Sequence, residues 1–225
     1  MRTIGKLRVK YSKGEPLRFI SHLEVVSAIR QSVRRADLPV CFSEGFSPQP
    51  KISFGPPLAV GYTSNCEIFD MEVESRIDVE IAKKRLKEST PKYLDVISVL
   101  AVPIDVKAME LFINVSKYSI LMPFIDIDKE VITSKIKNLF DSKEFFIERL
   151  TDKSKKQIDV RPLVINMILV EGKIEMLLRF GPGRTAKPDV IIQKIFDLSN
   201  EEKLSLRINR DEIFHENEIG EMVKQ

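Results

Sequence analysis

The first half of the chain alternates between strand-like and helix-like patterns of hydrophobic residues. Residues 4–11 alternate apolar and basic side chains, which predicts a half-buried strand with its basic residues on the other face. Apolar residues then recur at helical spacing from Leu23 to Val33, and this helix is expected to end before Pro39. The remaining patterns predict one more helix, at 78–89, and strands at 40–42, 52–54, 58–62, 66–73 and 94–102.

The second half repeats this order of elements. Its patterns predict a helix at 129–141, another starting at Pro188, and strands at 118–124, 144–150, 158–170, 174–180 and 204–208. Two successive β-α-β-β-α-β patterns predict an α+β protein built of two ferredoxin-like sandwiches in tandem. The expected domains are residues 1–104 and 111–215, followed by a tail at 216–225.

The first long helix begins with a capping box. Glu24 follows Ser21 by three residues, so the Ser21 hydroxyl can accept the Glu24 N–H and the Glu24 side chain can reach back. This helix and the Gly/Pro-rich loop after it belong to the segment from Arg18 to Gly61, whose polar residues are more specific than packing requires. We therefore expect the binding surface of the protein in this segment.

Composition sets broad limits on the class of protein. The chain has 225 residues, 43% of them hydrophobic, and a net charge of +3, so it can bury a core and carries only a mild basic excess. Cys41 and Cys66 are too few to hold an iron–sulfur cluster or a structural zinc ion, and they are expected to be core thiols. Without a long apolar run or a signal peptide, we expect a cytoplasmic protein that makes no membrane contact.

Two sets of residues near the first helix are candidates for binding an anion or a nucleic acid. The basic residues Arg18, Arg30, Arg34, Arg35 and Lys51 suit phosphate or carboxylate groups, although a solvated helix face explains them equally simply. The loop from Ser43 to Lys51 is stiffened by two prolines, and its Phe46 is expected either to stack on a base or to plug the core.

Other candidates lie at a glycine loop, a histidine and two carboxylates. Gly181-Pro182-Gly183-Arg184 precedes a helix and could hold phosphate, or it could be a plain turn. His22 is a possible proton carrier or a polar first-turn residue. Asp70 shares a strand face with Glu72, as Asp159 does with Arg161, and either arrangement could be a site or an ordinary ion pair.

The chain resembles a bacterial family, the radical SAM-associated uncharacterised proteins. In the second half the matching motifs are 158–162 and Ala186-Lys187-Pro188. The match is denser in the first 75 residues, where it comprises Arg18-Phe19, Ser21-His22-Leu23-Glu24, Arg34-Arg35-Ala36, Leu38-Pro39, Ser43-Glu44-Gly45-Phe46, Pro48, Pro50-Lys51, Ser53-Phe54, Pro57-Leu58, Val60-Gly61, Ser64, Glu67 and Asp70.

This resemblance implies a role beside a radical SAM protein. The CxxxCxxC cluster motif is missing here, so S-adenosylmethionine and the iron–sulfur cluster are expected on the partner and no cofactor on this chain. The gene surroundings of such families imply RNA or a ribosomal component as substrate. We expect a non-catalytic accessory protein that binds this substrate through Arg18, His22, Arg30, Arg34, Ser43, Phe46, Lys51, Arg161 and Arg184.

Two alternatives stay open. A stand-alone RNA-modifying enzyme would use Asp70 or Asp159 as its catalytic carboxylate and His22 as a proton carrier. A purely structural protein-interaction module would tolerate loss of Arg34.

Overall fold

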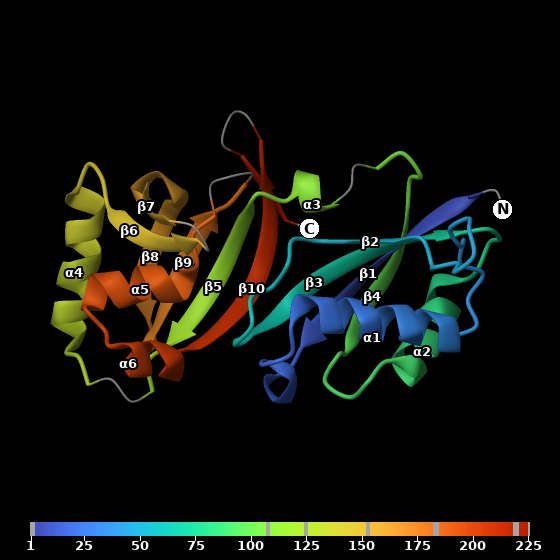
Figure 1. Cartoon of the computed structure of the whole chain (residues 1–225), viewed down its shortest axis with the longest axis horizontal. Coiled ribbons are helices and arrows are strands. Elements are labelled where there is room, and N and C mark those ends of the chain that lie inside the picture. The colour runs from blue at the N-terminus through green and yellow to red at the C-terminus, as the bar shows by residue number, and fades with distance from the viewer. Residues whose placement is uncertain are drawn as a thin grey trace. The chain divides into compact units, whose positions relative to one another are not determined.

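The computed structural model describes residues 3–106, 109–123, 126–151, 154–181, 185–217 and 221–224 (Figure 1). The chain divides into two compact units, residues 1–113 and 114–225. Each unit combines helices with an antiparallel sheet, so the protein is an α+β protein.

The sheet of the first unit has the strand order β4-β1-β3-β2, and all its neighbouring strands are antiparallel. Strand β1 (Gly5–Lys13) lies between β4 (Val96–Val102) and the long β3 (Tyr62–Val73), and the short β2 (Ile52–Phe54) pairs with the other side of β3.

Helices α1 (His22–Arg35) and α2 (Val79–Ser89) cover one face of this sheet (Figure 1). A 3-10 turn at Glu15–Leu17 precedes α1, and the short α3 (Met109–Phe112) contacts β2 and β3. The Ser21 and Glu24 capping box is confirmed, with the Ser21 N–H 2.7 Å from a Glu24 carboxylate oxygen.

The core of the first unit lies between the sheet and these two helices. Val9 of β1 and Phe69 of β3 pair in register and face α1, whose Ile29 and Val33 are buried against them. Because successive strand residues point to opposite faces, Arg8 lies on the other face of the sheet, as the alternating pattern predicted.

The sheet of the second unit has the order β10-β5-β9-β8, again antiparallel throughout. The strands are β10 (Arg207–Glu216), β5 (Val115–Leu121), β9 (Lys173–Arg179) and β8 (Val164–Val170). The unit also contains the helices α4 (Lys129–Asp141), α5 (Pro188–Phe196) and α6 (Asn200–Ser205), a separate hairpin of β6 (Phe146–Thr151) and β7 (Ser154–Asp159), a 3-10 turn at Arg161–Leu163, and β11 (Met222–Lys224).

Several predicted elements differ from the structure for local reasons. The single strand expected at 158–170 is divided between β7 and β8, because Pro162 lies in a 3-10 turn between them. Residues 58–61 are not strand, since the chain turns after Pro56-Pro57 and β3 starts at Tyr62.

The end of the chain is also more ordered than the sequence indicated. Residues 200–205 form α6, whose capping box joins Ser199 to Glu202, and the last predicted strand therefore begins at Arg207. The expected tail at 216–225 is wrong for residues 222–224, which form β11 against β10. Asn217 explains this pairing, because its N–H donates to the Glu221 carbonyl (3.0 Å) and its Oδ1 accepts the Glu221 N–H (2.9 Å).

Candidate binding surface

The loop at residues 43–49 is an excursion from the edge of the first sheet. The Cys41 N–H donates to the Glu72 carbonyl of β3 (2.9 Å), and the Glu72 N–H donates to the Lys51 carbonyl (3.1 Å). The Lys51 N–H in turn donates to the Cys41 carbonyl (2.8 Å). The chain therefore leaves the sheet after Cys41 and returns to the same place at Lys51.

Two of the predicted site residues hold this loop in shape. The Ser43 N–H donates to the Gln49 carbonyl (2.8 Å), and the Ser43 hydroxyl accepts the Gln49 N–H (3.0 Å), which closes the loop at its base. The Arg34 guanidinium donates to the Pro48 carbonyl (2.6 Å) and to the Gln49 side-chain oxygen (3.2 Å). Arg34 thus fastens the loop to α1.

The tip of the loop presents Phe46 to solvent. Its side chain is fully exposed, so the alternative in which Phe46 plugs the core is wrong. Gly45, with φ of 112°, makes the turn that lifts Phe46 away from the sheet, a backbone conformation that residues with a Cβ rarely adopt. A rigid loop that displays a large aromatic ring supplies a stacking platform at low entropic cost.

Along α1, the predicted residues His22, Arg30 and Arg34 form one stripe at spacings of eight and four residues. The His22 ring is edge-on to Phe54 of β2, and Arg34 reaches the loop that precedes β2, so the stripe runs beside this strand. The Nε of Arg30 is buried, and it has no hydrogen-bond partner among the residues that the structure describes.

Arg18 and Lys51 contribute less to a free basic surface than the sequence indicated. Arg18 is buried, with its guanidinium 3.0 Å from Glu15 and 4.3 Å from the Phe19 ring centre. Lys51 is exposed and forms a long ion pair with Glu72 (3.8 Å). Burial makes Arg18 part of the framework, and its role in binding stays a prediction, whereas Lys51 lies at the surface beside the loop.

The framework around Arg18 includes a lysine that the sequence analysis did not single out. Lys13, at the buried end of β1, donates from its ammonium group to the carbonyls of Arg18 (3.2 Å) and Ile20 (3.0 Å). These bonds fix the turn that leads into α1. The alternation of β1 gave the signal, because Lys13 continues the inward series of Val9 and Tyr11.

Two of the predicted site residues, Arg161 and Arg184, belong to the second unit. Arg161 lies over the Phe140 ring (4.7 Å) and donates to the carbonyls of Val164 (3.3 Å) and Phe140 (3.4 Å), so it braces the end of α4. Arg184 and the glycine loop before it lie outside the described residues, apart from Gly181.

The carboxylates of the enzyme hypothesis are engaged in holding the fold. Asp70 is buried and receives two hydrogen bonds from Arg8 (2.8 and 3.0 Å), on the sheet face opposite His22. In the second unit, Asp159 accepts the backbone N–H groups of Phe145 (2.8 Å) and Arg161 (3.0 Å). Neither carboxylate shares a site with His22.

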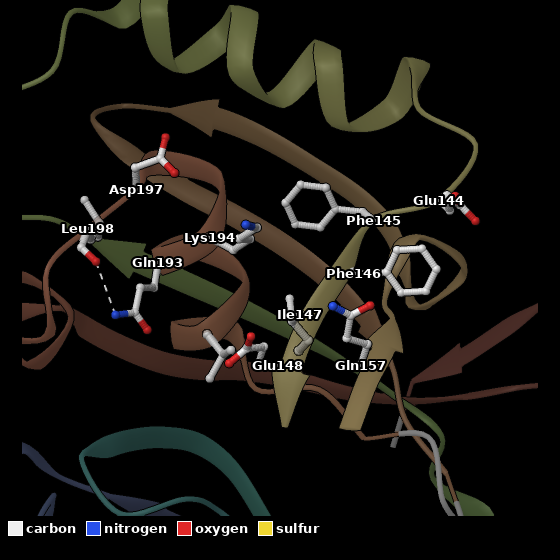
Figure 2. Close-up of a pocket in the computed structure, with 11 residues that line it drawn as sticks. Glu144, Phe145, Phe146, Ile147, Glu148, Gln157, Gln193, Lys194, Asp197 and Leu198 are labelled. Carbon is white, nitrogen blue, oxygen red and sulfur yellow. Dashed lines mark hydrogen bonds between the residues drawn. The ribbon is translucent and has the colours of Figure 1, made fainter. Parts of the chain in front are cut away.

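The second unit holds a cavity of about 750 Å³ that the sequence analysis did not anticipate (Figure 2). It lies between the β6–β7 hairpin and α5, and its wall mixes apolar and charged side chains, among them Phe145, Phe146, Glu148, Lys194 and Asp197. The side-chain amide of Gln193 donates a hydrogen bond to the Leu198 carbonyl (3.2 Å), which fixes the end of α5. The strand predicted at 144–150 corresponds to β6, whereas β7 begins at Ser154, before the strand predicted from residue 158.

The described residues contain neither a metal-ligand cluster nor a membrane-spanning helix. Among the residues that the structure describes, no group of three or more His, Cys, Asp or Glu side chains is arranged to hold a metal ion. Across the same residues, no helix combines the length and the apolar character that a membrane span needs.

The fold and this surface define an α+β protein of two units with an exposed, braced loop on the first. The family described as an uncharacterized protein conserved in bacteria (DUF2344) matches residues 6–188, and the chain belongs to this family. The match gives no link to radical SAM enzymes, so that part of the resemblance stays a prediction.

Known structures and curated proteins add little to this assignment. One similar chain comes from the crystal structure of a Cbf5-Nop10-Gar1 complex, with a TM-score of 0.46 and 11% identity. The alignment covers 94% of this chain and 50% of that chain, so this protein spans half the length of its structural neighbour. No curated protein matches the chain.

Proposed function

We propose that the protein is a non-catalytic accessory protein that captures single-stranded RNA for a partner enzyme. The observation that carries this proposal is the fully exposed Phe46 at the tip of a loop braced by Arg34. Any RNA base can stack on such a ring, so this contact does not depend on the RNA sequence. Lys51 at the foot of the loop supplies a cation for the phosphate backbone.

The same framework argues against catalysis by this chain. Asp70 and Asp159 each use their oxygen atoms to hold neighbouring groups, and His22 lies on the other side of the sheet from Asp70. A general acid–base mechanism needs such groups within hydrogen-bond reach of one substrate. Binding without chemistry is the simpler function for this arrangement.

The nature of the partner rests on the resemblance to the radical SAM-associated family. In this proposal the partner carries S-adenosylmethionine and the iron–sulfur cluster, while this chain presents the RNA or a ribosomal component that contains it. Purification of the chain together with a cluster-bearing enzyme, detected by its iron content and absorbance, would support this part.

The fold proposal is that both units are ferredoxin-like. Each unit has four main strands: β1, β2, β3 and β4 in the first, and β5, β8, β9 and β10 in the second. Counted in chain order within each unit, the fourth pairs with the first, the first with the third, and the third with the second. Helices connect the first strand to the second and the third strand to the fourth, as the β-α-β-β-α-β pattern requires. A solved structure of the chain tests this assignment.

RNA binding is tested with a short, labelled, single-stranded RNA of mixed sequence, followed by fluorescence anisotropy over a range of salt concentrations. We expect binding that weakens as salt rises, and a loss of about fivefold to a hundredfold in Phe46→Ala, because one base loses its stacking partner. Ser47→Ala, at the neighbouring exposed position, is the matched control. Absence of binding at low salt, or equal affinity of the Phe46→Ala variant, would refute the RNA proposal.

A further inference from the structure

Strand β2 has one unpaired edge. Ser53 is in register with Asp70 of β3, and the flanking Lys51 and Gly55 also bond to β3, through the Glu72 N–H (3.1 Å) and the Ile68 carbonyl (2.9 Å). In an antiparallel pair the bonding alternates, so the N–H and C=O groups of Ile52 and Phe54 point away from β3. Within the described chain no hydrogen bond reaches these four groups.

Helix α1, whose His22 ring contacts Phe54 of β2, also carries Arg30. On α1, Arg30 falls between His22, which contacts Phe54, and Arg34, which contacts the loop before β2. Its Nε is buried and without a partner in the described part of the molecule. A buried guanidinium nitrogen without a partner is costly, and an incoming carboxylate would satisfy it.

Both ends of the edge are closed. At one end the loop at 43–49 leaves the sheet, and at the other the chain turns away at Gly55, where a Cβ would come within 2.9 Å of the Ile68 side chain. The open edge is therefore only three residues long, about 10 Å. It suits a short extended segment and is too short for edge-to-edge pairing of two sheets.

We propose that an extended, acidic segment of a partner protein adds to the β2 edge as a short strand, with one carboxylate bound by Arg30. Backbone groups of the segment would pair with the N–H and C=O groups of Ile52 and Phe54, which is the recognition mode of β-augmentation. RNA does not present this alternation of backbone donors and acceptors. The proposed site uses neither the Phe46 nor the Lys51 side chain. The protein would therefore hold RNA at the loop at 43–49 and its partner protein at the β2 edge.

The test uses a labelled synthetic peptide of alternating valine and threonine with one central glutamate, titrated with the full-length protein. Ile52→Pro removes an outward N–H and leaves the bonds to β3 in place, a position where edge strands tolerate proline. We expect it to weaken peptide binding about tenfold or more, because an N–H is lost and a peptide carbonyl is left unpaired. Ser53→Ala, on the other sheet face, is the matched control, and thermal unfolding confirms that each variant is folded.

Arg30→Gln separates the charge from the backbone pairing. We expect this variant to bind the glutamate-centred peptide about tenfold more weakly and to bind a glutamine-centred peptide with unchanged affinity. The reason is that the variant removes only the ion pair between the guanidinium and the peptide carboxylate. If Ile52→Pro unfolds the protein, the wild type is tested instead with two peptides whose alternate amides are N-methylated in one register or the other. Only the peptide whose methylated amides would face β2 should lose binding.

Three results would overturn the proposal. The first is absence of peptide binding, or equal affinity of the wild type and Ile52→Pro. The second is a wild-type dimer that Ile52→Pro dissociates, which would make a second copy the occupant. The third is loss of RNA binding in Ile52→Pro with peptide binding intact, which would assign the edge to RNA. Failure of RNA binding in all variants would refute the proposed function alone.

Discussion

At the residue scale, the best-placed ion pair of the first unit is Arg8 with Asp70. Two nearly parallel hydrogen bonds join them, and only 2% of the Asp70 side chain and 16% of the Arg8 side chain is exposed. Removing one member of such a pair leaves the other charge buried and uncompensated. We expect Asp70→Ala to lower the free energy of unfolding by about 3 kcal/mol, measured by urea denaturation.

The matched control for that variant is Lys51→Ala. Lys51 is exposed and its ion pair with Glu72 is long, so its loss should change stability by less than about 0.5 kcal/mol. A result in which Asp70→Ala is as stable as the control would show that the buried pair contributes little to folding.

A second prediction at this scale concerns acid. The hydrogen bonds from Arg179 lower the pKa of Glu216 below the usual value of 4.5, and they raise the pKa of Arg179. Because the folded-state pKa is depressed, the pair stabilises the protein at a pH above 4.5 and loses this effect as the pH falls through the lowered pKa.

Glu216→Gln should therefore be less stable than the wild type by about 1 kcal/mol at neutral pH, since Arg179 is partly exposed and solvent weakens the pair. Urea denaturation of both proteins between neutral and strongly acidic pH measures the difference. The two curves should converge at low pH, and a constant difference would contradict the assigned cause.

At the element scale, Arg34 is the tie between α1 and the loop at 43–49. Arg34→Ala should leave the global stability nearly unchanged, because the guanidinium is exposed, but it should free the loop. Hydrogen exchange of the Gln49 amide, followed by mass spectrometry, should become faster. Gln31→Ala, elsewhere on the exposed part of α1, serves as the control, and unchanged exchange in Arg34→Ala would show that Ser43 alone closes the loop.

The elements most accurately predicted from the sequence are those whose determinants are local. The capping box of Ser21 and Glu24 and the helix at 129–141 depend on neighbours within one or two turns, and both are present as expected. The Ser199 and Glu202 box carries the same local signal for α6, which the strand predicted from residue 204 partly overlaps.

Contacts between distant residues account for most of what the sequence patterns did not reveal. Arg18 is an exception, because its near neighbours Glu15 and Phe19 hold its guanidinium in a buried position. The pairing of Arg8 with Asp70 spans 62 positions of the chain, and no local pattern announces it. The cavity beside the β6–β7 hairpin likewise depends on how that hairpin lies over α5.

At the scale of the whole molecule, the positive charge is unevenly divided. Residues 1–113 contain 17 Lys and Arg against 14 Asp and Glu, whereas residues 114–225 contain 19 of each, so the entire excess of +3 belongs to the first unit. The exposed Phe46 belongs to the same unit, which makes it the expected place for RNA.

Ultraviolet cross-linking of bound RNA, with the attached peptides identified by mass spectrometry, tests this assignment on the intact chain. Cross-links should concentrate on the peptide that contains Phe46 and be absent from those that line the cavity of the second unit. Predominant cross-linking to residues 144–198 would transfer the RNA site to the second unit.

The excursion at residues 43–49 has a consequence for engineering the protein. Because Ser43 and Gln49 are bonded to each other and the sheet resumes at Lys51, the length of the loop is independent of the register of β2 on β3. A short epitope or a fluorescent label inserted beside Phe46 should therefore leave the sheet intact. The loop is thus a natural attachment point for reporters, and its length can vary among relatives without a change in the fold beneath it.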